Sequence, residues 1–124
     1  MQNRSSFRDL KLWRDAMVLV EDVSRLSAGF PRDERCGLTA QLRRTAVSIP
    51  SNIGEGKRRK RHRAFLYHLD VALGSQGEVD VQLELACCLR CVDQQQYDET
   101  QRRVAEVGRM LNGLIESLQP SDED

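Results

Sequence analysis

The sequence predicts an all-α protein, with residues 1–124 forming one domain of four amphipathic helices in an antiparallel, up-down bundle. Three observations support this fold class. Apolar residues recur at intervals of three and four along nearly the whole chain, which is the spacing of a helix face. Aromatic residues make up only 5% of the chain, fewer than a sandwich or barrel usually has. A length of 124 residues is enough for one modest core.

The first helix is predicted over about residues 9–28. Its main apolar face is expected to contain Leu10, Trp13, Met17 and Val20. A second row, spaced by seven, widens that face: Leu12, Leu19 and Leu26. Gly29 suits a C-terminal cap and Pro31 prevents continuation, so the helix is expected to end there. A short disordered N-terminus is expected to precede it.

The second helix is predicted over about residues 34–56, with this apolar face: Leu38, Leu42, Ala46, Ile49 and Ile53. Pro50 lies inside it and removes one backbone donor, which predicts a kink near residues 48–52. Asn52 is expected to bond backbone groups that Pro50 frees. Gly54 and Gly56 are expected to end the helix.

The third helix is predicted over about residues 62–91, with a seam that one polar residue interrupts: Phe65, Leu69, Ala72, Gln76, Val79, Leu83 and Ala86. Asp93 and Gln96 resemble a capping box that opens a fourth helix over about 94–118. That helix is followed by an acidic C-terminal tail. We expect these residues to be buried: Leu42, Ile49, Leu69, Val79, Leu111 and Leu114.

Each helix has more apolar surface than one narrow seam requires. In a lone bundle those additional faces would be exposed to solvent, which monomeric soluble proteins usually avoid. The sequence therefore predicts self-association.

The composition predicts a cytoplasmic protein without a membrane segment. No apolar run approaches the roughly 20 residues that span a bilayer, and the charged N-terminus lacks a signal-peptide pattern. The formal net charge is zero, but it is unevenly distributed. Residues 57–63 contain six cations and no anion, whereas residues 64–124 contain four cations and twelve anions. This segregation indicates either neutralisation within or between copies, or a basic patch for an anionic partner.

No pattern of residues predicts an enzyme, and we expect no catalytic residue, cofactor or metal. The "GEGK" segment beginning at Gly54 lacks the preceding strand and the Ser or Thr of a P-loop. The Glu-x-x-His pairs of di-metal bundles are missing. The four cysteines are expected to be reduced thiols, and the C-x-x-C spacing of Cys88 and Cys91 has no second ligand pair nearby.

The basic segment is the candidate functional site, and six of its residues are expected to contact nucleic-acid phosphates: Lys57, Arg58, Arg59, Lys60, Arg61 and Arg63. Cations suit the end of the second helix but oppose the dipole at the start of the third, where no good N-cap residue is available. A poor helix start indicates another use for the charge. The alternatives are a solvated loop neutralised by acidic helices and a nuclear-localisation segment.

Several motifs resemble one family over nearly the whole chain: "FRDLKLWRDAM", "FP", "GLTAQLRRTAVSIPSNIGEG" and "ALGSQGEVD". The family is typified by four-helix-bundle proteins encoded in intervening sequences of bacterial large-subunit rRNA genes, and is similar to the accessory protein of diversity-generating retroelements. The resemblance implies a ring, typically a homopentamer, with a basic surface for nucleic acid. Gly54 replaces the family's usual Ala, and Arg and His replace its serine-rich start of the third helix.

Two functions follow as hypotheses. The first is a non-enzymatic homo-oligomer that binds RNA or DNA with low sequence specificity. The alternative is an assembly scaffold that docks a protein partner, such as a reverse transcriptase, with no direct nucleic-acid role. Beside the motif, Glu55 is expected either to pair with Arg43 or Arg44 or to bind across a subunit boundary. Gly74 and Ser75 are expected to allow close helix approach.

Overall fold

The computed structural model describes residues 6–33 and 37–119, and these contain four α helices, one short 3-10 helix and no strand. The all-α prediction is confirmed. The elements are η1 (Phe7–Asp9), α1 (Lys11–Ala28), α2 (Leu38–Arg58), α3 (His62–Cys88) and α4 (Gln94–Leu118). Several predicted features lie outside the described residues: the disordered N-terminus, the start of the second helix at 34–36 with Cys36, and the acidic tail.

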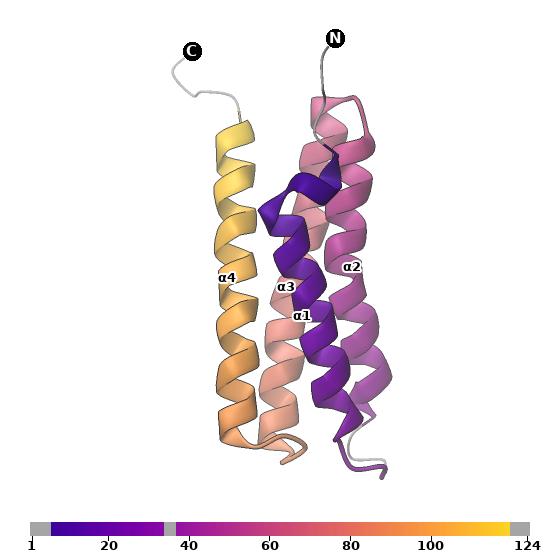
Figure 1. Ribbon diagram of the computed structural model, residues 1–124, viewed down its shortest axis with the longest axis vertical. Helices are drawn as coiled ribbons and strands as arrows, with labels where there is room; N and C mark the ends of the chain where they lie inside the picture. Colours follow the sequence, from indigo (N-terminus) through magenta and orange to yellow (C-terminus); the bar gives the residue numbers. More distant parts are fainter. Residues whose placement is uncertain (1–5, 34–36, 120–124) are drawn as a thin grey trace.

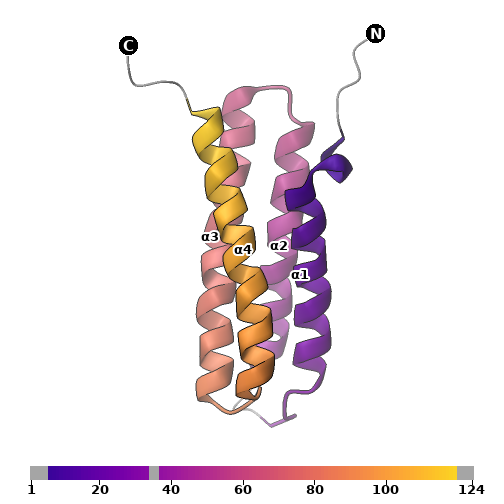
Figure 2. The same cartoon turned by 60° about the vertical axis from the view of Figure 1, so that its left-hand side comes forward.

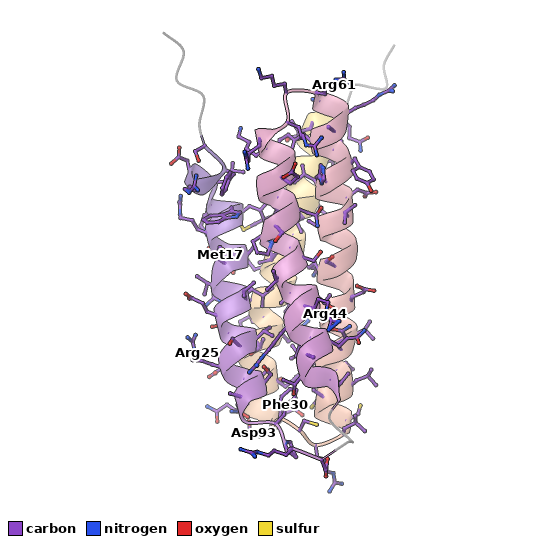
Figure 3. All side chains as sticks on the ribbon, turned by 90° about the vertical axis from the view of Figure 1, so that its right-hand side faces the viewer. Met17, Arg25, Phe30, Arg44, Arg61 and Asp93 are labelled. Carbon is purple, nitrogen blue, oxygen red and sulfur yellow. The ribbon has the colours of Figure 1, made fainter. Side chains whose placement is uncertain are left out.

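The four long helices lie side by side and alternate in direction (Figures 1 and 2). The most extensive contact joins α2 and α3, and α1 lies against both α2 and α4. One end of the molecule holds the start of α1, the α2–α3 connection and the end of α4 (Figure 1). Figure 3 shows Arg61 at this end and Phe30 and Asp93 at the other. Residues from distant parts of the sequence therefore meet at each end.

The core lies between the helices and consists of their aliphatic side chains. Five of the six residues predicted to be buried are fully buried: Leu42, Ile49, Leu69, Val79 and Leu111. Leu114 is only half-buried and packs against the core from outside. The burial prediction is confirmed for the helix centres and is wrong for this residue, which lies only four residues before the end of α4.

The apolar face of α1 differs from the prediction. Leu12, Leu19 and Leu26, the row that was expected only to widen the face, are buried, and so are Ala16 and Val23 between them. Met17, from the row expected to be the core, is 39% exposed. Both rows have helical spacing, so the spacing identifies a helix without showing which row faces the other helices.

Predicted helix ends are confirmed at two positions. Asp93 Oδ1 accepts from the Gln96 backbone N–H at 2.8 Å, and Gln96 Oε1 accepts from the Asp93 N–H at 3.3 Å, so the capping box opens α4. At the end of α1, the Gly29 N–H donates to the Leu26 carbonyl. These local bonds satisfy groups that a helix end leaves without partners.

The third helix ends at Cys88, before the predicted residue 91. Arg90 has a φ of 62°, which interrupts the helix. The Arg90 N–H donates to the Cys87 carbonyl and the Cys91 N–H donates to the Ala86 carbonyl, the pair of bonds of a Schellman motif. Glycine usually occupies the left-handed position of that motif. Because Arg90 occupies it here, the sequence did not indicate that α3 ends at Cys88.

The cysteines only partly match the prediction of reduced thiols. Cys87 and Cys88 have free thiols, whereas Cys91 is disulfide-bonded, so the prediction is wrong for Cys91. Within the described residues, no group of three or more His, Cys, Asp or Glu side chains is placed to hold a metal ion. None of the described helices is long and apolar enough to cross a membrane.

Candidate functional site

The candidate site is the turn between α2 and α3, and we call residues 57–63 the basic connection. It begins in the last turn of α2, where the Arg59 N–H donates to the Gly56 carbonyl at 3.1 Å. Arg61 is the N-cap of α3, with φ −90° and ψ 132°, and no side chain caps that helix start. The predicted absence of a cap is confirmed. Cations at this position oppose the helix dipole by up to about 1 kcal/mol each at low salt.

The two glycines before the connection do not end α2, so that prediction is wrong. Both are buried inside the helix, which continues to Arg58. A Cβ on Gly56 would lie 2.8 Å from the Cβ of His68 and 3.0 Å from the Phe65 ring, so glycine here allows α2 and α3 to approach closely. Gly54 lies against the ring of Phe7. The two glycines therefore leave space beneath the connection, Gly56 for α3 and Gly54 for the Phe7 ring of η1.

The six cations have different environments. Arg59 Nε donates to Glu55 Oε2 at 2.9 Å, in a salt bridge whose two side chains are 51% and 44% exposed. The expected pairing of Glu55 with Arg43 or Arg44 is therefore wrong, whereas the alternative contact across a subunit boundary stays a prediction. Lys57 Nζ lies 5.9 Å from the centre of the Phe65 ring, within cation–π range.

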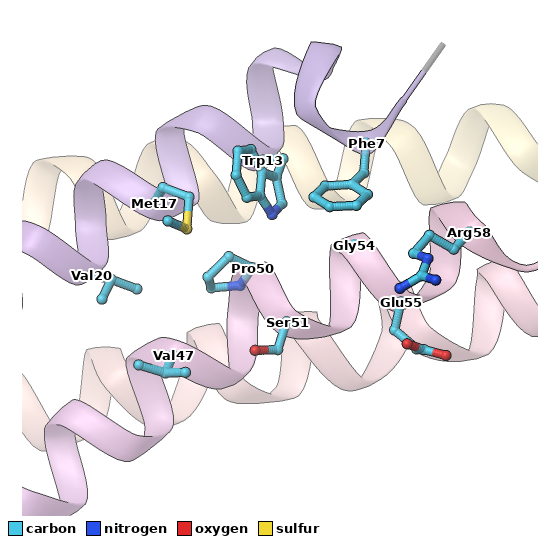
Figure 4. Close-up of a pocket in the computed structure, with 10 residues that line it drawn as sticks. All are labelled: Phe7, Trp13, Met17, Val20, Val47, Pro50, Ser51, Gly54, Glu55 and Arg58. Carbon is cyan, nitrogen blue, oxygen red and sulfur yellow. The ribbon is translucent and has the colours of Figure 1, made fainter. Parts of the chain in front are cut away.

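Three exposed cations in the second half of the connection differ from Arg59 in their charge partners. Lys60, Arg61 and Arg63 are exposed, and none forms an ion pair with a residue that the structure describes. Arg58 is exposed at the end of α2, beside Glu55 (Figure 4). Charge that no neighbouring carboxylate neutralises remains available to an anion in solution.

A hydrogen-bond network fixes α2 against α3 beneath the connection. Ser48 Oγ and Ser75 Oγ are 2.7 Å apart, and the Asn52 amide donates to the Ser48 carbonyl at 2.9 Å. His68 Nδ1 donates a hydrogen bond to Asn52 Oδ1 at 3.0 Å, because an amide oxygen can only accept. Asn52 thus bonds α3 and its own preceding turn, and not the Ala46 carbonyl that Pro50 leaves without its usual donor. Ser75 was expected at a close helix contact, and it lies at one. The part of His68 was not predicted, because its partner Asn52 is distant in sequence.

Gly74 does not take part in this helix contact, although it was expected to. A Cβ at Gly74 would meet nothing within 4 Å, so Gly74 faces open space. Ser75, its neighbour, is the buried residue that meets α2.

An apolar groove lies between α1 and α2, near the same end of the molecule (Figure 4). Its volume is about 490 Å³. These residues line it: Phe7, Trp13, Met17, Val20, Val47, Pro50, Ser51, Gly54, Glu55 and Arg58. Phe7 and Trp13 pack edge to face with ring centres 5.1 Å apart, and the Arg8 guanidinium lies 4.4 Å from the Phe7 ring centre. Arg8 therefore adds a cation to this end that sequence analysis missed.

The outward side of α3 is a second exposed apolar surface. Val81, Leu85 and Leu89 recur every four residues there and are 61%, 45% and 39% exposed. Met17 and Val47 are similarly exposed at the groove, at 39% and 47%. The prediction of apolar surface beyond the core is therefore confirmed, on two different sides of the structure.

The shifted pKa values belong to groups at the opposite end from the basic connection. A hydrogen bond to Glu84, with Tyr97 Oη 2.7 Å from Glu84 Oε1, raises the pKa of Tyr97 to about 12, and burial adds to the effect. Burial, followed by the charge of Cys88, raises the pKa of the Cys87 thiol. A raised thiol pKa keeps Cys87 protonated, which is the opposite of what a nucleophilic cysteine requires.

Comparison with known proteins gives one family. The model of the family described as 23S rRNA-intervening sequence protein matches residues 8–113. A crystal structure of a protein with unknown function from the S23 ribosomal protein family of Bacteroides thetaiotaomicron has a similar fold, with a TM-score of 0.78 and 20% identity. The similarity covers 84% of this chain and 97% of that one. Among the curated proteins, none matches this sequence.

Proposed function

This chain belongs to the 23S rRNA-intervening sequence protein family, and from that premise we propose that it is a non-enzymatic, homo-oligomeric protein that binds RNA or DNA through the basic connection. Binding is mainly to phosphates and has low sequence specificity, because arginine and lysine contacts to the backbone carry no base information. The contributing residues are Lys57, Arg58, Arg59, Lys60, Arg61 and Arg63. No cofactor or metal takes part.

One observation supports this proposal above the others. Lys60, Arg61 and Arg63 project from the end of the molecule without an ion-pair partner among the described residues. The alternative of a loop neutralised by acidic helices requires such partners. Among the residues of one copy that the structure describes, Glu55 is the one carboxylate that pairs with the connection, through Arg59.

The building block is a four-helix bundle that self-associates in the cytoplasm. The two exposed apolar surfaces support self-association, and the family resemblance suggests a symmetric ring of five copies. A ring presents the basic connection several times, so weak contacts reinforce one another if the nucleic acid can span them.

The test replaces four cations of the connection: Arg58→Gln, Arg59→Gln, Lys60→Gln and Arg61→Gln. We expect binding of labelled RNA and DNA, followed by fluorescence anisotropy, to be abolished while helicity and oligomer mass stay unchanged. Wild-type binding should weaken steeply with salt. On a single strand, each phosphate contact should contribute roughly −0.7 to the slope of log affinity against log salt concentration.

A matched control removes the same charge from exposed cations outside the basic connection: Arg32→Gln, Arg44→Gln, Arg102→Gln and Arg109→Gln. This control should bind nearly as the wild type does. If both quadruple variants weaken binding equally, overall charge and not the connection is responsible. If the wild-type oligomer binds neither RNA nor DNA at low salt, the proposal is wrong.

The groove between α1 and α2 favours a second candidate function, a scaffold that docks a protein partner. Its lining is largely apolar and includes Trp13 and Met17, side-chain types that are enriched at protein interfaces. This candidate would replace the first if Met17→Glu abolished capture of a partner protein while the quadruple connection variant left that capture unchanged.

A further inference from the structure

Tyr67 is the most exposed of the large hydrophobic side chains that the structure leaves on the surface, at 64%. It lies four residues after Arg63, so the two side chains share one face of α3 at the end that holds the basic connection. Its ring and that of His68 form a T-shaped pair, with ring centres 5.2 Å apart and planes at 75°. An exposed aromatic ring beside exposed cations is an arrangement that single-stranded nucleic-acid sites use.

The ring borders a small cavity between the start of α3 and the end of α4. The cavity has a volume of about 300 Å³ and is lined by Arg63, Leu66, Tyr67, Asp70, Ile115 and Gln119. That volume is at the lower limit of the ~300–1,000 Å³ of small-ligand sites, which suits a single base. The lining combines an aromatic wall, aliphatic contacts from Leu66 and Ile115, and polar groups at Asp70 and Gln119.

We propose that this cavity takes one unpaired base of a single-stranded nucleic acid, stacked on Tyr67, while Arg63 binds the adjoining phosphate. The proposal rests on the proposed function and names its substrate class. Arg63 belongs both to the cavity and to the basic connection, so one strand can engage both. A base inside a regular duplex is stacked and paired, and cannot enter without being flipped out.

Asp70 distinguishes a base site from a phosphate site. A carboxylate in the cavity repels a phosphate but accepts hydrogen bonds from the amino group of a base, as Asp and Glu do with cytosine. The Gln119 amide can donate to a base carbonyl or accept from an amino group. The phosphate therefore stays outside, on the cations, and the neutral base lies inside.

A hydrogen bond holds the two walls of the cavity together. His62 Nε2 lies 2.6 Å from the carbonyl oxygen of Leu118, although the residues are 56 positions apart. A carbonyl can only accept, so His62 Nε2 donates. His62 is the first residue of α3 and Leu118 the last of α4, so this bond fixes Arg63 and Tyr67 relative to Ile115 and Gln119. The site is thus formed before any ligand binds, which lowers the entropic cost of binding.

The test compares single-stranded RNA with a blunt RNA duplex of equal length, both fluorescently labelled, at low salt on the full chain. Tyr67→Ala should weaken single-strand binding by roughly 5- to 100-fold, the range for losing one base–aromatic stack. Its effect on the duplex should be less than about twofold. Tyr67→Phe keeps the ring and should bind the single strand almost as the wild type does.

Ultraviolet crosslinking gives an independent readout of the same contact. Trypsin separates the two tyrosines, since residues 64–89 contain no Lys or Arg and Tyr97 lies on the peptide after Arg90. We expect the single-stranded RNA adduct on the peptide 64–90 and not on the peptide 91–102.

The outcomes separate this proposal from the function on which it rests. If the quadruple connection variant loses binding while Tyr67→Ala binds the single strand normally, the base site is wrong and phosphate binding stands. If Tyr67→Ala weakens single strand and duplex equally, stacking of an unpaired base is also wrong. If the wild type binds no nucleic acid, the proposed function fails and the base site fails with it.

Discussion

Gly56 illustrates at the scale of one residue how α2 and α3 approach each other. Its missing side chain lets the backbone of α2 reach the Cβ of His68 and the ring of Phe65. The sequence showed a glycine near the end of a helix, and capping is the commoner reason for that placement. Only the neighbouring helix reveals the other reason, which is space, and helix periodicity cannot show which residues of α3 lie opposite.

We expect Gly56→Ala to destabilise the protein by about 1–3 kcal/mol, because the added methyl group must displace the Cβ of His68 or the Phe65 ring. Gly113→Ala is the matched control, since a Cβ at Gly113, inside α4, would meet nothing within 4 Å. That change should stabilise the helix by about 0.5–1 kcal/mol. Urea unfolding at one fixed protein concentration measures both, and equal effects of the two substitutions would show that the close approach has no energetic role.

The Glu55–Arg59 pair shows, also at this scale, why the site residues were not all equivalent. The sequence places six cations in seven positions but does not say which of them a neighbour neutralises. Glu55 and Arg59 are four apart on one helix face and form the salt bridge across that spacing. That spacing was available as a signal, whereas the position of Lys57 against Phe65 depends on how α2 meets α3.

At the scale of the helices, the sequence predicted the elements better than their orientation. Helical spacing located four helices and the capping box of α4, both set by local contacts. It placed Met17 in the core and missed the end of α3 at Cys88. The exposure of Met17 depends on which helices pack against α1, and the end of α3 depends on the left-handed backbone conformation of Arg90. Neither can be recognised in the spacing of apolar residues.

The uncapped start of α3 gives a prediction at this scale. Arg61 already has the extended backbone of an N-cap, so Arg61→Ser should supply the missing cap bond. We expect the free energy of unfolding to rise by about 0.5–2 kcal/mol while nucleic-acid affinity falls. Both results together would show that Arg61 lowers the stability of α3 and raises the affinity for nucleic acid.

Lys60→Ser is the control for this substitution. It removes an equal charge one position before the N-cap, so it should weaken binding without stabilising α3. Thermal or urea unfolding and fluorescence anisotropy measure the two effects. A gain in stability from Lys60→Ser equal to that from Arg61→Ser would mean that relief of repulsion, and not capping, is responsible.

At the scale of the whole molecule, the contiguous positive charge of the basic connection lies at one end of the fold. The basic connection lies beside the start of α1 and the end of α4 (Figure 1). The connection could be located from the sequence because its charge is contiguous. Arg8 and the cavity beside Tyr67 could not, because their residues come together only when helices distant in sequence pack.

The two exposed apolar surfaces give the prediction for the assembly. In the self-association that we propose, the groove between α1 and α2 of one copy would contact the outward side of α3 of another. Because the two surfaces differ, this contact would be head to tail, and a closing rotation would make a ring. We expect Val81→Glu with Leu85→Glu to convert the oligomer to a monomer of about 14.2 kDa in light scattering, because two buried carboxylates would lack partners. Gln95→Glu with Asn112→Glu adds the same charge at exposed positions of α4 and should leave the mass unchanged. A wild-type chain that is already monomeric at micromolar concentration would remove the ring, and each basic connection would then bind alone, without the reinforcement that several copies provide.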